Sequence, residues 1–158
     1  MVHTEQLFKT LEGKVKELEI ELNSPATAQE IESLETAVNQ KLPPELLDFY
    51  SFCNGFETND TLFRVIPISE IISYKHELAT SWFYFAEYMI YSDDWKVKLQ
   101  GSEQYIITND NHNSGTLITL TDSISEFLER YLTGGGVFGE NGLYKWFDEI
   151  NENKKNFT

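Results

Sequence analysis

The glycine-rich stretch GGGVFG, residues 134–139, has residue types that could cradle a phosphate. It fits the G-x-G-x-x-G dinucleotide fingerprint, in which a strand leads into the loop and a helix N-terminus faces the pyrophosphate. In this chain a predicted helix precedes the glycines, and no β-α-β unit surrounds them. We therefore expect residues 134–139 to connect two helices and to bind no cofactor.

The polar stretch TNDNHNSG, residues 108–115, could offer ligands to a metal ion through Asp110 and His112. A calcium loop counted from its first asparagine would need glycine at the sixth position and glutamate at the twelfth. The sequence has Ser114 and Leu120 at those positions. A hairpin turn rich in Asn, Ser and Gly explains the composition better, so we expect no metal site.

The remaining reactive side chains are not arranged for catalysis. Cys53 is the only cysteine, which excludes an intramolecular disulfide and a cysteine zinc cage, and its apolar surroundings favour a buried, inert thiol. Asp93 and Asp94 could form a carboxylate pair, but adjacent residues at a strand start point in opposite directions. The histidines fit no metal-binding spacing; they are His3, His76 and His112. We expect a protein that is not an enzyme.

The chain is strongly acidic. Its 158 residues include 26 Asp and Glu against 12 Lys and Arg, a net charge of −14. Residues 1–60 hold twelve acids and four bases, a balance of −8 and more than half of the excess. Such a surface repels nucleic acid and anionic lipid and attracts a basic protein, although the same charge also serves solubility. No apolar run is long enough to span a membrane, and we expect a cytoplasmic protein.

Apolar residues at helical spacing predict helices towards both ends of the chain. Thr27 begins a capping box, Pro43 ends that helix, and Pro44 starts the next, which closes at Asn54 and Gly55. Ser69 is the predicted cap of a short helix. The longer helices are expected over residues 4–22, 27–42, 44–53, 123–132 and 141–150, with a frayed tail after the last.

The middle of the chain has the pattern of short strands. The aromatic run of residues 81–91 predicts a central strand covered on both faces, which could also line a ligand pocket. Residues 94–99 alternate apolar and charged side chains, so one face is wet, and this strand could form an edge where a second copy pairs. Short turns favour an antiparallel meander. We expect one α+β domain over residues 1–158, a meander packed against N-terminal and C-terminal helices, as a monomer or weak homodimer.

The order of these features resembles the SUKH superfamily, which unites bacterial immunity proteins of polymorphic toxin systems with fungal cell-wall assembly regulators. The resemblance covers residues 27–132, and Glu87 stands where aspartate is commoner in one branch. The matching elements are Leu42-Pro43, Asn54-Gly55, Pro67-Ile68-Ser69-Glu70-Ile71, the strand FAEYMIYSDDW and the closing helix SISEFLERYL. The resemblance implies an α+β fold without catalytic apparatus.

The resemblance also implies a function: a cytoplasmic immunity protein that binds a cognate toxin domain and blocks its active site. The acidity agrees, because a nuclease-type toxin must itself be basic. Two alternatives stay open, a regulatory or scaffold module like the fungal members and a small-molecule-binding domain. We expect the toxin to contact exposed acids and aromatics near the strand turns, namely Asp93, Asp94, Trp95, Glu103, Asp110 and His112.

Overall fold

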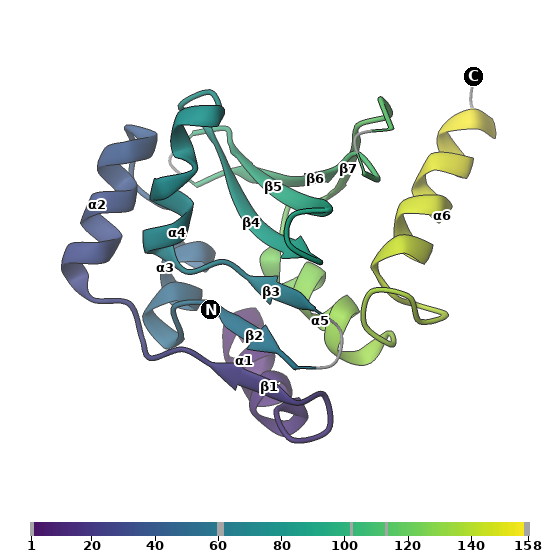
Figure 1. The fold of residues 1–158 in the computed structure, drawn as a ribbon, viewed down its shortest axis with the longest axis horizontal. Coiled ribbons are helices and arrows are strands. Elements are labelled where there is room, and N and C mark those ends of the chain that lie inside the picture. The colour runs from purple at the N-terminus through teal and green to yellow at the C-terminus, as the bar shows by residue number, and fades with distance from the viewer. Residues whose placement is uncertain (1, 60–61, 102, 113, 157–158) are drawn as a thin grey trace.

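The centre of the molecule is an antiparallel sheet whose strands lie in chain order (Figure 1). The structure, a computed structural model, describes residues 2–59, 62–101, 103–112 and 114–156. Each strand pairs with the next, so the predicted α+β class and antiparallel meander are confirmed. The strands are β1 (Ile20–Leu22), β2 (Phe56–Thr58), β3 (Phe63–Val65), β4 (Trp82–Tyr88), β5 (Asp93–Leu99), β6 (Tyr105–Asn109) and β7 (Ile118–Thr121).

Helices surround the sheet on several sides. Helices α1, α3 and α5 contact one another, α2 packs on α4, and α6 lies along β7 (Figure 1). None of the helices in the described part of the chain is both long and apolar enough to cross a membrane. The helices are α1 (Val2–Lys14), α2 (Ala28–Val38), α3 (Pro44–Phe52), α4 (Ile68–Ser73), α5 (Ile124–Thr133) and α6 (Leu143–Asn156), with a 3-10 turn at Lys75–Glu77.

Aromatic side chains fill the space between the sheet and helices α3 and α5. Phe85 of β4 lies 5.9 Å, between ring centres, from both Phe49 of α3 and Phe127 of α5. Trp95 of β5 contacts Phe63 edge-on at 5.7 Å and Phe127 at 6.1 Å. All five side chains are fully buried. Because each aromatic ring removes a large apolar area from water, this cluster contributes strongly to the fold's stability.

The first predicted helix is too long. Leu7 and Leu11 are fully buried as the stripe predicts, but α1 ends at Lys14, and the chain reverses at Glu19, where φ is 53°. Residues Ile20–Leu22 then form β1 and pair with β2. The leucine spacing fitted a helix, but pairing with a distant strand decided the conformation of its last residues.

The predicted helix caps are partly confirmed. Thr27 forms the complete capping box with Glu30, but α2 ends at Val38, where Asn39 has φ 57°, rather than at Pro43. The helix α4 is capped by a distant side chain and not by Ser69: Oδ1 of Asn54 accepts the Ile68 N–H at 2.9 Å. The Asn-Gly pair therefore links the end of α3 to the start of α4.

Gly55 is required by its position. Its φ is 79°, and a Cβ there would lie 2.3 Å from the carbonyl oxygen of Val65. Only glycine lets the chain after α3 pass this close to β3. Asn54 and Gly55 thus have structural functions, but they do not close α3 as the sequence predicts: the helix ends at Phe52 and its cap, Cys53, is extended.

Three further expectations are corrected by the structure. The aromatic strand ends at Tyr88 and not at residue 91, because the next three residues are left-handed. β5 is not an edge strand, since it pairs with both β4 and β6; the edges are β1 and β7. The tail does not fray after residue 150, because α6 continues to Asn156.

Candidate functional site

Two of the six predicted contact residues, Asp93 and Trp95, are buried. β5 begins at Asp93, and its odd-numbered residues face the aromatic core. The relative exposure of Trp95 is 0% and that of Asp93 is 2%, so the expectation that they lie exposed at a turn is wrong. The alternation of the strand determines this: residue 94, between them, points to the opposite face.

Asp93 fastens neighbouring segments together from inside. Its Oδ1 accepts hydrogen bonds from Nδ2 of Asn109 at 3.0 Å and from the N–H of His112 at 3.1 Å. Its Oδ2 accepts the Tyr144 hydroxyl of α6 at 2.6 Å. Burial, together with this bond to Asp93, raises the pKa of the Tyr144 phenol, which therefore stays protonated.

His112 completes this cluster at the surface. Its Nε2 lies 3.0 Å from the Tyr144 hydroxyl and its Nδ1 lies 2.9 Å from the carbonyl of Ser92. The arrangement holds α6 and the loop after β6 against the β4–β5 turn, and His112 acts there as a fastening residue.

Charged residues form a row across the other face of the sheet. The strand register places Glu57 beside Arg64, Arg64 beside Glu87, and Glu87 beside Asp94, one residue from each of β2, β3, β4 and β5. Directly opposed residues in a sheet share a face, so these four side chains are neighbours. We call them the charged row.

Asp94 is held at an energetic disadvantage in this row. Its carboxylate pairs with Nζ of Lys96 at 2.6 Å. Burial raises the pKa of Asp94; Lys96 lowers it less than burial raises it, and the charge of Asp110 raises it further. Asp94 and Asp110 are therefore close enough for their charges to repel each other. The exposed Glu103 is not part of this group, because it follows the opposite end of β5, about 20 Å along the strand.

Replacing Asp94 with asparagine tests this disadvantage. A carboxyl whose folded-state pKa is raised destabilises the fold above its unfolded pKa, because the native state then resists losing the proton. Asp94→Asn should therefore raise the free energy of unfolding at pH 7 by about 0.5 kcal/mol or more. The gain should vanish below the ordinary pKa of 3.8. Urea unfolding at pH 7 and pH 3 measures both values; a loss of stability at pH 7 would contradict the interpretation.

The sequence did not reveal the most unusual feature, the turn between β4 and β5. Met89, Ile90 and Tyr91 have φ values of 55°, 52° and 59°. Left-handed backbone costs about 1–2 kcal/mol per residue outside glycine, and it is rarest for β-branched side chains such as isoleucine. Ile90 is nevertheless 91% exposed, so no burial of its side chain compensates for this strain.

A second exposed turn bonds to the residue before Ile90. Leu62, at φ 58°, precedes β3, and its carbonyl accepts the Met89 N–H at 3.1 Å. Leu62 and Met89 are 51% and 50% exposed. We call Leu62, Met89 and Ile90 the apolar tip. Three large apolar side chains that protrude together on strained backbone are typical of a binding surface rather than of a solvated turn.

An ionic network fixes the backbone below the tip. Arg64 donates from Nε to Glu87 at 2.5 Å and through both terminal nitrogens to Glu70 at 3.1 and 2.5 Å. Glu87 accepts the Tyr91 N–H at 2.9 Å, and Glu70 accepts the Tyr91 hydroxyl at 2.5 Å. We call Arg64, Glu70, Glu87 and Tyr91 the tip network. The bonds from Arg64 join β3 to β4 and to α4, and the two bonds from Tyr91 attach the residue that follows Ile90 to this frame, so the network holds the strained turn in place.

The electrostatics of the tip network agree with this structural function. The hydrogen bond from Arg64 lowers the pKa of Glu70, and the bond to Glu70 raises that of Arg64, so both remain charged. Burial first, and then the bond to Glu70, raises the pKa of Tyr91. With Glu57 3.8 Å from Arg64, three carboxylates surround one guanidinium, and the surroundings of the tip are acidic.

Ile90 stands between two hollows. One, of about 570 Å³, is bordered by α4 and by the side chains of Tyr74 and Tyr91; the other, of about 280 Å³, lies towards Leu62 and Glu57. Arg64 and Glu87 line both. A partner that encloses Ile90 could therefore place its own side chains on either side of it.

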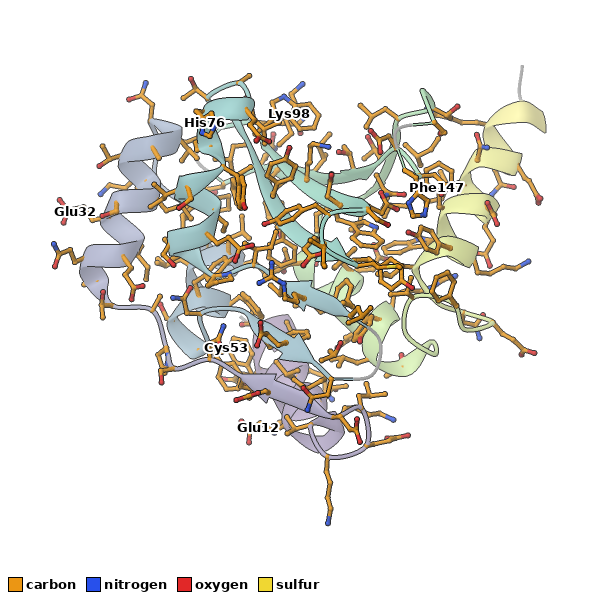
Figure 2. The ribbon with its side chains drawn as sticks, viewed as in Figure 1. Glu12, Glu32, Cys53, His76, Lys98 and Phe147 are labelled. Carbon is orange, nitrogen blue, oxygen red and sulfur yellow. The ribbon has the colours of Figure 1, made fainter. Side chains whose placement is uncertain are left out.

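The aromatic residues of β4 are used in packing. Phe83 and Phe85 are fully buried in the core. Trp82 and Tyr84 lie on the other face, where Nζ of Lys98 is 5.5 Å and Nζ of Lys96 is 5.3 Å from the respective ring centres. Figure 2 shows Lys98 near the end of β5, beside the start of β4. Among the described residues, no group of three or more His, Cys, Asp or Glu side chains could hold a metal ion.

The fold and the tip together define an α+β protein of the SUKH type that presents a rigid apolar projection in acidic surroundings. A family model for the SMI1 / KNR4 family (SUKH-1) matches residues 25–130, and the chain belongs to this family. The match includes the tip and its network. The family includes toxin-immunity proteins and is generally non-catalytic. No curated protein matches the chain.

Proposed function

We propose that this protein is an immunity protein that binds a cognate toxin domain and blocks its active site. The observation that carries the proposal is the apolar tip: Ile90 is almost completely exposed on a strained turn that four side chains hold rigid. Strain of this kind persists where function requires it. Membership of a family that includes toxin-immunity proteins supports the same function.

Charge complements the apolar contact. A toxin that acts on nucleic acid needs a basic cleft, and the net charge of −14 attracts such a surface and speeds encounter. Near the tip, the charged row and Asp110 supply the acids that would face the rim of the cleft. We therefore place Ile90 at the centre of the contact and Asp94 and Asp110 at its edge.

This placement revises the contact set expected from the sequence. Asp93 and Trp95 are buried, so they position β5 and fall outside the proposed contact. Glu103 lies at the far end of β5 and falls outside the proposed contact, and His112 fastens the loop that carries Asp110. The centre of the contact shifts to the residues immediately before Asp93.

Co-expression with the toxin domain encoded by the neighbouring gene tests the proposal. We expect the toxin domain alone to stop growth and the pair to grow normally, and the two proteins to purify as a complex. Absence of both rescue and complex would contradict the proposed function. A complex without rescue would contradict blocking of the active site, because binding would then leave the toxin active.

A further inference from the structure

A groove of about 730 Å³ lies among helices α1, α3, α5 and α6, none of which contributes to the apolar tip. Most of the charged side chains that line this groove are acidic. We call it the acidic groove. Its charged side chains are those of Glu45, Asp122, Glu126, Glu129 and Arg130, and Ser125 is one of the hydroxyl residues that line it.

The carboxylates of the groove retain free acceptor oxygens. Oε1 of Glu45 accepts from the Ser123 hydroxyl at 2.9 Å, from the Ser125 N–H at 3.3 Å and from the Tyr105 hydroxyl. Its Oε2 receives no hydrogen bond from the described residues. Among the described residues, the one partner of the Glu126 carboxylate is the hydroxyl of Thr121, which bonds to one of its oxygens. The part of the chain that the structure describes likewise offers no donor to the carboxylates of Asp122 and Glu129.

Arg130, the one cation among the described residues that line the acidic groove, already bonds to groups outside the acidic cluster. Arg130 donates from Nε to the carbonyl of Asn141 at 2.5 Å and from a terminal nitrogen to Glu149 at 3.2 Å. Its guanidinium also lies 5.3 Å from the ring centre of Trp146. The groove therefore has four carboxylates and one guanidinium, and the hydrogen bonds of that guanidinium go to Asn141 and Glu149 rather than to the four carboxylates.

A second, independent observation comes from Ser125. Its relative exposure is 5%, and its Oγ is a buried polar atom without a hydrogen-bond partner among the described residues. Buried hydroxyls are nearly always partnered, because an unpartnered one loses its hydrogen bonds to water without replacement. Ser125 lines the acidic groove, so a donor that enters the groove could supply the missing bond.

We propose that the acidic groove receives an arginine side chain of the partner protein. A guanidinium has five N–H donors and no acceptor, which suits carboxylates with free oxygens and a hydroxyl oxygen that accepts no bond from the described residues. Glu126 and Glu129 hold its charge, and the hydroxyl of Ser125 accepts one of its protons. The proposal rests on the proposed function only for the identity of the partner as the toxin domain.

The test uses the whole protein and a small probe. Acetyl-Gly-Arg-Gly-amide is titrated into ¹⁵N-labelled protein, with the citrulline peptide as its neutral isostere. We expect saturable shifts of the amides at residues 123–129 with the arginine peptide. The double variant Glu126→Gln, Glu129→Gln should bind about tenfold more weakly, because two charge-assisted contacts are lost.

A matched variant controls for overall charge. Glu21→Gln, Glu32→Gln also removes two negative charges, but from exposed positions on β1 and α2; Figure 2 shows Glu32 on the outer side of α2. It should bind the arginine peptide as the wild type does. Equal shifts with the citrulline peptide, equal weakening in both double variants, or no saturable shift at residues 123–129 would each overturn the proposal.

Ser125→Ala separates a binding role from a structural one. Because its Oγ has no partner in the unbound protein, the substitution should leave the free energy of unfolding unchanged or raise it. Affinity for the arginine peptide should nevertheless fall, about threefold or more. Unchanged affinity would remove Ser125 from the site. None of these titrations contains the toxin, so their failure would leave the proposed function standing, and failure of growth rescue would leave the groove standing.

Discussion

Replacing Ile90 with aspartate is expected to weaken the complex with the toxin domain about 100-fold, since a central anchor residue contributes about 2–4 kcal/mol to binding. The fold should not suffer. Ile90 is 91% exposed, and aspartate tolerates the left-handed conformation better than isoleucine does, so the melting temperature should stay the same or rise. Isothermal titration of the purified pair measures the affinity.

The sign of this effect distinguishes apolar anchoring from simple charge attraction. A basic toxin would bind an additional acid at least as well if only charge mattered, so Ile90→Asp with undiminished affinity would contradict the apolar tip as anchor. Leu47→Asp is the matched control. Leu47 is an exposed leucine in the first half of α3, where an acid suits the helix dipole, and we expect no change in affinity.

Removal of Arg64 is expected to have the largest effect on stability. In Arg64→Leu the carboxylate of Glu87, only 3% exposed, would lose its cation, and the free energy of unfolding should fall by about 3 kcal/mol at pH 7. A buried carboxylate without a cation is costly, because it has left water and gained no compensating charge.

A double variant tests the cause of that loss. Arg64→Leu with Glu87→Gln removes the unpaired charge and keeps the shape of the side chain, so most of the stability should return. Urea unfolding of the wild type and the two variants measures this recovery. If the double variant were no more stable than Arg64→Leu, the loss would have to come from packing of the arginine stem rather than from the buried charge of Glu87.

Local signals were readable in the sequence. Thr27 forms the expected capping box with Glu30, because a cap needs only residues within one helical turn. Pro44 begins α3 for the same reason. At the start of α5 the Ser123 hydroxyl accepts the Glu126 N–H, but the Glu126 carboxylate bonds to Thr121, so only half of the capping box that the Ser-x-x-Glu pattern predicts is formed. The meander also follows from short connections, which leave neighbouring strands little choice but to pair antiparallel.

Non-local contacts determined what the sequence did not show. β1 and β2 are three-residue strands that exist because they pair with each other, and neither has a pattern of its own. The apolar tip was hidden for a related reason. Ile90 has a side chain typical of strands, and the bonds that hold the turn reach other parts of the chain. The Met89 N–H donates to the carbonyl of Leu62, and Tyr91 donates its N–H to Glu87 and its hydroxyl to Glu70.

The contact residues predicted from the sequence lie close to the tip, but two of them, Asp93 and Trp95, are buried. Asp93 and Asp94 were identified as turn acids, yet β5 already begins at Asp93, so one of them points into the core. A register shift of one residue exchanges the two faces of a strand, and the sequence alone does not fix where the strand starts. The turn itself lies immediately before them, at Met89 and Ile90.

Hydrogen exchange of the protein with and without its toxin domain locates the binding surface. We expect amides at residues 89–92, together with Leu62 and its neighbours in β3, to exchange markedly more slowly in the complex, and exchange on the outer face of α2 around Glu32 to stay the same. Protection that leaves residues 89–92 unaffected, in a complex that neutralises the toxin, would contradict binding through the apolar tip.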